Sequence, residues 1–331
     1  MRDFLDVAGS LRHEVGSDFV EDFKLVFEGI AELRVAQSKA RIDIDNIESV
    51  FAAFEIAALF GRLGELSVED TRRLAPAMRR VIARTLELRI RFPRLQPGAD
   101  GSPVPYGQFA RLVAKMPSVS VMTFNYDVAL DHAVNSADIP VDYCLLPERI
   151  VNGLEVMKLH GSLNWARCSK CGQIDAWPLD QLSGTHFRGR GSEAKWSFLE
   201  FVGDLQRRVH CAAPCQPDPV IVPPTWSKTE HYREIDSVWK RAAKHLSEAE
   251  NIVVIGYSLP PTDQFFRYLY ALGTMSRTRL RNFIVCNPDG RPTTKRRFKR
   301  LLGQATRGRY AYSTDTFQAA IHHLPETLAH S

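Results

Sequence analysis

Residues 251–263 read NIVVIGYSLPPTD, and they contain the clearest element boundary in the chain. The mostly apolar first half predicts a buried strand over 251–255, and the glycine and prolines after it predict a turn into a helix over 262–275. A second apolar run predicts another strand over 282–286. Buried strands separated by helices of ten or more residues are typical of a parallel sheet covered by helices on both faces.

The same alternation continues along the chain around this stretch. Further strands are expected over 119–124, 155–159 and 219–222, and further helices over 126–136, 232–248, 293–302 and 317–323. The first 92 residues predict only helices, because apolar side chains recur there every three or four positions. One of these helices is expected to start at Ile47, with Asn46 as its cap. The sequence therefore predicts a helical portion over 1–115, packed on an α/β core over 116–331.

Composition places the chain among ordinary soluble globular proteins. It has 331 residues, of which 44% are hydrophobic and 24% charged, and a formal net charge of +5. No window approaches 18 uninterrupted apolar residues, and the first six residues lack the apolar core of a signal peptide. We therefore expect a cytoplasmic protein without a membrane span. The basic residues gather at 277–281 and 295–300, where a solvated helix face explains them more simply than a phosphate-bearing partner, so direct nucleic-acid binding is not expected.

The segment 123–127 reads TFNYD and stands where a predicted strand ends and a helix begins. Ligands of open α/β sheets bind beyond the carboxyl ends of strands, so polar side chains here are candidates for a site. Asn125 offers a hydrogen-bond donor and an acceptor, and Asp127 offers acceptors only. The same two residues also suit a simpler role as caps of the next helix, which their spacing alone favours.

A second polar residue at a strand end is His160, within the segment 158–165, which reads KLHGSLNW. Histidine is the usual general base near neutral pH, and Gly161 would let a ligand approach the backbone closely. A lone histidine is more often a structural group. The strand end and the adjacent glycine nevertheless make His160 the best candidate among the histidines for a catalytic base.

Four of the six cysteines form two close pairs, Cys168 with Cys171 and Cys211 with Cys215. Each pair can hold a metal ion from a tight turn, and four thiolates together complete a tetrahedral zinc site. Such a site has no open coordination position, so the zinc is expected to be structural. Two unconnected pairs are the alternative. The pairs define an insertion in the α/β core over about 166–217.

Two further turns could contact a ligand. Gly256 and Ser258 follow the predicted strand 251–255, where backbone N–H groups and a hydroxyl suit a phosphate. Asn287 follows the strand 282–286 and could hydrogen-bond a ribose. Ordinary strand–turn–helix connections would explain the same residues.

Taken in this order, the motifs resemble those of the sirtuin superfamily, and more closely the bacterial sirtuin-like group of NAD-consuming proteins, many of which act in anti-phage defence. The resemblance covers about 119–290 and implies a Rossmann-type parallel sheet that binds NAD, with the cysteine pairs as the family's zinc module. The catalytic positions that it implies are Asn125 and Asp127 of an Asn-x-Asp signature and His160 of a His-Gly signature. The cofactor-contacting positions that it implies are Thr123, Gly256, Ser258 and Asn287.

Two departures from the family bear on activity. The family opens with a strand and a glycine-rich Gly-Ala-Gly-x-Ser loop that cradles the pyrophosphate, whereas Ala8-Gly9-Ser10 of this chain follows no strand. About thirty residues of the usual opening are therefore expected to be lacking. Protein-deacylating sirtuins also carry a Phe-Gly-Glu strand that pairs with the acyl-lysine peptide, where this chain has Pro223-Pro224. Two prolines remove two N–H donors, which argues against a peptide substrate.

These features favour an NAD+ hydrolase that releases nicotinamide and ADP-ribose and contains structural zinc. Two alternatives stay open: an NAD-dependent protein deacylase or ADP-ribosyltransferase, and a regulatory subunit that binds NAD or ADP-ribose without turnover. The resemblance also implies an activating protein or phage component as a partner. It further implies that the chain forms a homo-oligomer or is one subunit of a defence complex.

Overall fold

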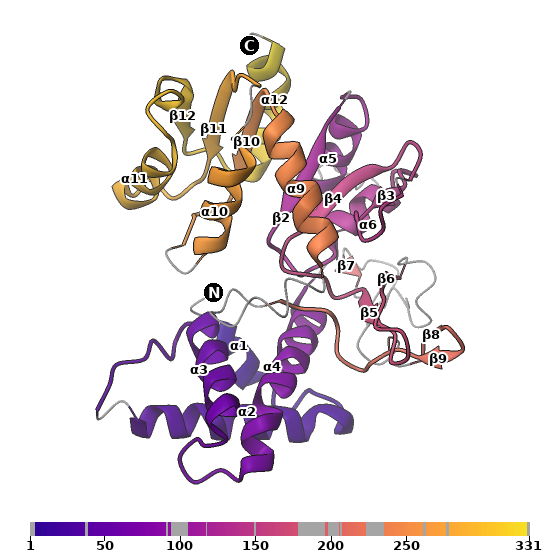
Figure 1. Ribbon diagram of the computed structural model, residues 1–331, viewed down its shortest axis with the longest axis vertical. Helices are drawn as coiled ribbons and strands as arrows, with labels where there is room; N and C mark the ends of the chain where they lie inside the picture. The colour runs from indigo at the N-terminus through magenta and orange to yellow at the C-terminus, as the bar shows by residue number, and fades with distance from the viewer. Residues whose placement is uncertain are drawn as a thin grey trace. The chain divides into compact units, whose positions relative to one another are not determined.

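The fold is described from a computed structural model (Figure 1). It describes residues 4–36, 39–90, 92–93, 105–116, 118–148, 150–177, 196–197, 205, 207–222, 235–260, 263–275 and 278–329. The chain forms two compact units. Unit 1 comprises Met1–Arg94, Thr123–His132 and Lys158–Ile235, and unit 2 comprises Leu95–Met122, Ala133–Met157 and Asp236–Ser331. The units draw on interleaved stretches of the chain, whereas the sequence-based division was placed at a single point near residue 115.

Unit 1 begins with a group of helices. They are α1 (Phe4–Ser10), α2 (Ser17–Ala36), α3 (Ile47–Phe60) and α4 (Val68–Arg89). The predicted cap of α3 is confirmed, because the side chain of Asn46 accepts a hydrogen bond from the backbone N–H of Glu48. Gly61 ends the same helix in the left-handed conformation, at φ 65°. Ser67 caps α4 by accepting from the N–H of Asp70.

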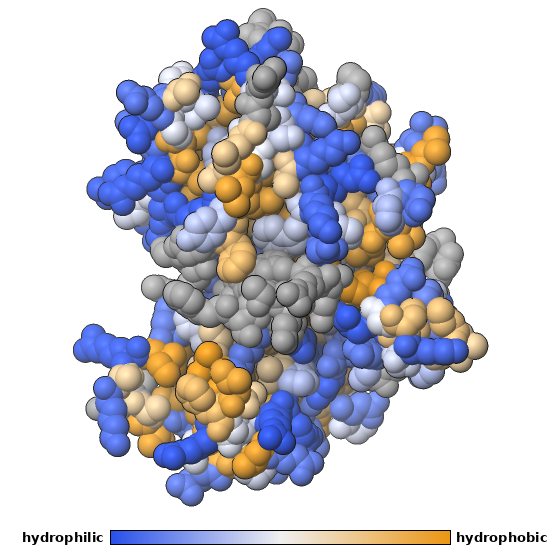
Figure 2. Space-filling view, viewed as in Figure 1, coloured by the Kyte–Doolittle hydropathy of each residue, from blue (hydrophilic) through white to orange (hydrophobic). Residues whose placement is uncertain are grey.

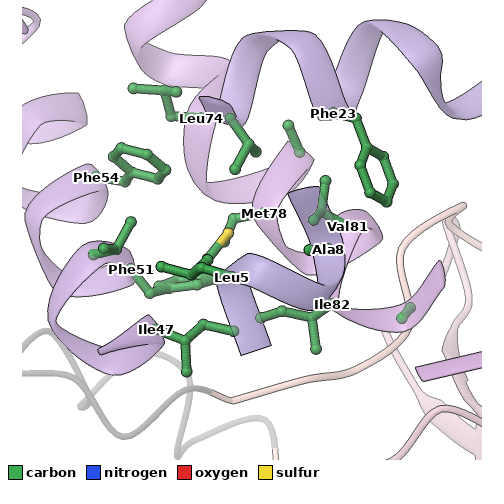
Figure 3. Packing of buried hydrophobic residues seen from close by; sticks show 14 of the residues in the cluster. Leu5, Ala8, Phe23, Ile47, Phe51, Phe54, Leu74, Met78, Val81 and Ile82 are labelled. Atoms are coloured by element: carbon green, nitrogen blue, oxygen red, sulfur yellow. The ribbon is translucent and has the colours of Figure 1, made fainter. Parts of the chain in front are cut away.

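The helices of unit 1 share one hydrophobic core (Figure 3). Phe51 and Phe54 of α3 pack with Leu74 and Met78 of α4, and Phe23 of α2 belongs to the same cluster. Burying side chains of this size contributes about 1.5–3 kcal/mol each. The cluster also contains Val128, Leu163 and Ile221, which come from segments that follow the four helices in sequence. The helical core is therefore completed by loops from later in the sequence.

α3 also has apolar residues on its outer face. Ile56, Leu59 and Phe60 are exposed, and Figure 2 shows hydrophobic side chains gathered over this helix. The helix thus carries more apolar surface than its packing within unit 1 covers.

The insertion that carries the cysteines contributes short hairpins to unit 1. β5 (Trp165–Arg167) pairs antiparallel with β6 (Ile174–Ala176), and β8 (Val209–His210) pairs with β9 (Ala213–Pro214). β1 (Phe92–Pro93) pairs with β7 (Trp196–Ser197). The strand predicted over 219–222 is wrong among the described residues, where this stretch makes only an isolated antiparallel bridge from Ile221 to Gly161.

Unit 2 contains a parallel sheet in the order β10–β11–β12. β10 (Asn251–Ile255) and β11 (Asn282–Cys286) match the two strands predicted from their apolar runs, and β12 (Tyr310–Ser313) was not predicted. Helices follow each strand or precede it. They are α9 (Asp236–Glu248), α10 (Gln264–Gly273), α11 (Pro292–Leu301), the 3₁₀ turn η2 (Arg307–Arg309) and α12 (Phe317–Ala329).

A second small sheet has the order β2–β4–β3, with β3 and β4 parallel. Its strands are β2 (Ser120–Thr123), β4 (Leu154–Lys158) and β3 (Val141–Asp142), and α5 (Pro105–Val113) and α6 (Ala129–Asn135) flank β2 in sequence. The last residue of β2, Thr123, and the last residue of β4, Lys158, already belong to unit 1. Helices around parallel strands, with a cysteine cluster in an insertion, confirm the predicted fold class. Among the described residues, no helix combines the length and apolar character needed to cross a membrane.

Candidate functional site

The first candidate segment is the loop from Thr123 to Asp127, which joins β2 to α6. The Thr123 hydroxyl accepts a hydrogen bond from the N–H of Asn125 at 3.1 Å. Asp127 acts as a cap, because its Oδ1 accepts from the N–H of Ala129 at 2.9 Å. Asn125 is exposed at the centre of the loop. The Asp127 side chain thus stabilises the loop, while the Asn125 side chain lies at the surface.

The second candidate, His160, lies directly against this loop. Its imidazole is only 5% exposed and meets the Phe124 ring edge-on, with 5.1 Å between ring centroids. The Tyr126 ring lies 6.1 Å from it. The N–H of Leu159 donates to the carbonyl of Thr123 at 2.9 Å, so the carboxyl ends of β4 and β2 meet. The structure therefore brings together the two segments that the sequence singled out as strand-end motifs.

Gly161 lets the chain turn sharply after His160. It has a φ of +80°, and a Cβ placed there would lie 2.0 Å from the carbonyl oxygen of Val220. Two backbone hydrogen bonds flank this contact, from the N–H of Ser162 to Val220 and from the N–H of Val222 to the carbonyl of His160. Glycine is required here because no other residue leaves room for the neighbouring backbone.

A buried polar chain lies behind His160, and sequence reasoning did not identify it. Ser162 donates to Oδ1 of Asn164 at 2.7 Å, and the Asn164 amide donates to the carbonyl of Trp177 at 3.0 Å. Ser162 and Asn164 have no exposed surface. The only sign of these buried polar residues in the sequence is the alternation of polar and apolar residues in KLHGSLNW. This chain connects the His160 turn to the end of β6, the hairpin strand of the cysteine insertion.

A buried ion pair is the other feature that sequence reasoning missed. Lys158, at the end of β4, lies 2.9 Å from the carboxylate of Asp131 on α6. Its ammonium also donates to the backbone carbonyl of Asp127 at 2.6 Å. A lysine in a mostly apolar strand gives no sign from sequence alone that its charge will be buried.

The cysteine insertion contains a candidate metal centre. Cys168, Cys171, Cys211 and His210 offer ligand atoms that all lie within 4.8 Å of one another. Three of these are predicted ligands, and His210 was missed although it stands next to Cys211. The fourth predicted ligand, Cys215, is buried and forms an isolated bridge with Cys168, but its sulfur is outside this group.

The donor set fits zinc. Three thiolates and an imidazole are common zinc ligands. The backbone N–H of Cys171, followed by the imidazole of His210, lowers the pKa of the Cys168 thiol to about 6, which favours the thiolate that a metal requires. His210 Nδ1 lies 3.3 Å from the sulfur of Cys171, while its Nε2 lies 3.4 Å from the carboxylate of Asp175. A carboxylate behind the imidazole is the usual way in which a metal-binding histidine is oriented.

The remaining predicted ligand contacts lie in unit 2, at the carboxyl ends of its parallel strands. The N–H of Gly256, which has a φ of +74°, donates to the carbonyl of Cys286. The Asn287 amide donates to the carbonyl of Tyr257 at 3.0 Å, and its oxygen accepts from the N–H of Asp289 at 2.9 Å. Asn287 therefore ties the two turns together. The structure brings Gly256, Ser258 and Asn287 to one edge of the sheet, as predicted for parallel strands.

Arg297 of α11 was missed at this edge. Its guanidinium is half-buried and donates to the carbonyl of Ser258 at 3.5 Å. Asp289, beside the same turn, hydrogen-bonds the Arg291 side chain and then Thr294, which holds the pKa of its carboxyl well below the usual range. The turn after β10 thus has a cation at its backbone, which suits an anionic ligand.

Among solved structures, those similar to this chain include sirtuins. Sir2Tm bound to a propionylated peptide is 14% identical with a TM-score of 0.39, and the match covers 80% of this chain and 83% of that chain. Sir2 with a p53 peptide and NAD+ is 15% identical with a TM-score of 0.36, over 72% of each chain. A mutant Sir2 homologue with ADP-ribose is 18% identical with a TM-score of 0.35, over 69% of each chain. No protein-family model and no curated protein matches. At TM-scores below 0.5, the function has to be argued from the site.

Proposed function

We propose that this chain hydrolyses NAD+ to nicotinamide and ADP-ribose. The observation that carries the proposal is the meeting of two strand ends, which sets the His160 imidazole against the loop that presents Asn125. A shielded base beside an exposed amide suits the cleavage of a ribose–nicotinamide bond. It is also the combination that the resemblance to sirtuins implies for these residues.

The chemistry assigns a role to each side chain. Breaking the bond to nicotinamide builds positive charge on the ribose, as in glycoside cleavage. His160 would accept a proton from the attacking water or from a ribose hydroxyl, and Asn125 would position the water or the ribose. Asp127 holds the loop through its cap to Ala129, and its carboxylate would orient the nicotinamide. Thr123 shapes the same loop. The resemblance to sirtuins implies that Gly256, Ser258 and Asn287 of unit 2 contact the cofactor's phosphate and ribose.

Zinc fits the cysteine insertion as a structural ion. Cys168, Cys171 and Cys211, with His210 or Cys215 as a fourth ligand, would hold it. When bound, the ion supplies coordinate bonds that fasten the turn after β5 to the β8–β9 hairpin. The Ser162–Asn164 chain then connects this fastened insertion to the His160 turn.

The alternatives differ in their acceptor. A deacylase needs a strand that pairs with the peptide, and Pro223-Pro224, which lie outside the described residues, lack the N–H donors for it. ADP-ribosyl transfer would use the same bond cleavage with a protein nucleophile. Following the resemblance, we place the hydrolase in the cytoplasm in anti-phage defence, as a homo-oligomer or a subunit of a complex that an activating protein or phage component switches on.

The proposal is tested by incubating the purified chain with NAD+ and measuring nicotinamide and ADP-ribose by chromatography. Asn125→Ala and His160→Ala should each lower the release by about 10²–10⁴-fold, the usual contribution of a general base or a positioned water. His322→Ala and Asn135→Ala are controls of the same residue types at exposed positions, and they should keep full activity.

Three other outcomes would replace the proposal. Full activity in His160→Ala would remove the assigned base. Nicotinamide release that appears only with an acylated peptide would identify a deacylase. Binding of NAD+ without turnover, with or without a candidate activator, would identify a regulatory subunit.

A further inference from the structure

The buried ion pair between Lys158 and Asp131 lies under the proposed active site and has no role in the chemistry described so far. The two side chains are 1% and 2% exposed, and their charged atoms are 2.9 Å apart. Taking two charges out of water is costly, and their mutual attraction recovers this cost only with good geometry and further hydrogen bonds. A buried ion pair therefore calls for an explanation other than stability.

The third partner of the pair supplies that explanation. The Lys158 ammonium also donates to the backbone carbonyl of Asp127 at 2.6 Å. Lys158 stands two residues before His160, and Asp127 stands two residues after Asn125. The ammonium thus fastens the strand that carries the proposed base to the loop that carries the proposed amide.

Asp131 fixes the direction of this contact. It lies on α6, the helix that begins after the same loop, and its carboxylate is 2.9 Å from the Lys158 ammonium. Held by both the Asp131 carboxylate and the Asp127 carbonyl, the buried ammonium has little freedom to move. The Asp127 side chain, in turn, accepts from the N–H of Ala129, which starts α6. Loop, helix and strand are therefore joined through a single buried nitrogen.

We propose that Lys158 and Asp131 are positioning residues, which set the distance between Asn125 and His160 and thereby the rate of the chemical step. This inference rests on the proposed NAD+ hydrolysis. It assigns no contact with substrate to either residue. Their loss should lower kcat because the reacting groups are misplaced, and should leave KM nearly unchanged because the cofactor contacts remain.

The test uses paired substitutions, because removing one partner would leave an uncompensated buried charge. Lys158→Met with Asp131→Leu removes both charges and the bond to Asp127; methionine has about the volume of lysine, whereas leucine is larger than aspartate. In this Met/Leu variant, kcat should fall about 100-fold, with KM within about threefold of the parent value. Lys158→Gln with Asp131→Asn keeps hydrogen-bonding groups without charge, and should recover part of the lost kcat. Arg84→Met with Glu87→Leu is the matched control, since that ion pair is also largely buried in unit 1 but lies within α4, and its kcat should not change.

A second measurement keeps the inference separate from the hydrolase assignment. The amides of Leu159 and Leu163 donate to the carbonyls of Thr123 and Tyr126, so they report on the junction itself. Hydrogen exchange of these two amides should speed up in the Met/Leu variant, and not in the Arg84/Glu87 control.

The outcomes decide both questions. Unchanged kcat in a folded Met/Leu variant would overturn the positioning role, as would an equal loss in the control. If the Met/Leu variant does not fold, the Gln/Asn variant is compared with the parent, and full kcat together with unchanged exchange would overturn the inference. If the parent does not turn over NAD+ at all, the proposed function fails, and the exchange rates alone then decide whether the pair fastens the loop to the strand.

Discussion

Replacing Gly161 with alanine tests the packing at the centre of the candidate site. An alanine there would have to adopt a φ of +80° and would place its Cβ 2.0 Å from the carbonyl oxygen and 2.9 Å from the carbonyl carbon of Val220. Both atoms are backbone, so no side-chain rotation relieves the clash. The segment that contains Val220 must move, or the His160 turn must open.

The magnitude follows from what this movement breaks. The left-handed conformation costs an L-residue about 1–2 kcal/mol. The two backbone hydrogen bonds that flank the contact, Ser162 to Val220 and Val222 to His160, contribute about 1 kcal/mol each. We therefore expect Gly161→Ala to lower the free energy of unfolding by about 3–4 kcal/mol, or the melting temperature by roughly 6–16 °C for a unit of this size.

The matched control is Gly172→Ala. Gly172 has a similar φ of +74°, but a Cβ placed there meets nothing within 4 Å. It should show only the conformational cost, about 1–2 kcal/mol. Calorimetry of the parent and the two variants measures the loss of unfolding free energy in each, and so separates the cost of the left-handed backbone from that of the Val220 contact. Equal losses in Gly161→Ala and Gly172→Ala would refute the argument, because the Val220 contact would then contribute nothing.

The other predictions concern the metal centre and pH. Chelation or Cys171→Ser should remove about one zinc ion per chain, counted by elemental mass spectrometry, and should lower the melting temperature, since structural zinc contributes to folding; an unchanged melting temperature after complete loss of zinc would contradict this. If His210 is the fourth ligand, His210→Ala should weaken zinc binding more than Cys215→Ser does, and the reverse order would favour four thiolates. Burial lowers the pKa of His132, so below about pH 6.5 the unfolded chain binds a proton that the folded chain does not. Stability should therefore fall from pH 7 to 5, and fall less in His132→Gln; equal slopes would show that this imidazole does not matter.

Much of the fold could be predicted because its strands are continuous apolar runs. β10 and β11 have the predicted first and last residues. Their ends are clear in the sequence because Gly256 and Asn287 interrupt the apolar runs. β12 was missed because Tyr310–Ser313 is short and mixes aromatic with small residues. The stretch 219–222 has the same apolar character as a strand, yet within the described residues only Ile221 forms a bridge. Its neighbours Val220 and Val222 instead make individual backbone hydrogen bonds to Ser162, Trp165 and His160.

The candidate site could be predicted only in part. Asn125 and His160 were accessible to sequence reasoning because polar residues at strand ends of one sheet come together at its edge. The roles of Lys158, Ser162 and Asn164 depend on burial, which a single sequence does not show for polar residues. His210 could not be predicted from the spacing of the cysteines, although it stands directly beside Cys211.

The helical portion has a direct physical connection to the site. Its core is closed by Val128, Leu163 and Ile221, which stand just after the Asn125 loop, just after the His160 turn, and beside the Gly161 bridge. Val128 and Leu163 stand three residues from Asn125 and His160 in the chain, and Ile221 bridges Gly161, so a shift of the helices displaces all of these segments at once. Protein interiors are close-packed and transmit such shifts instead of absorbing them. The helices of unit 1 are therefore the support on which Asn125 and His160 keep their mutual position, and this explains why those site loops group with the helices more than with the strands that they follow.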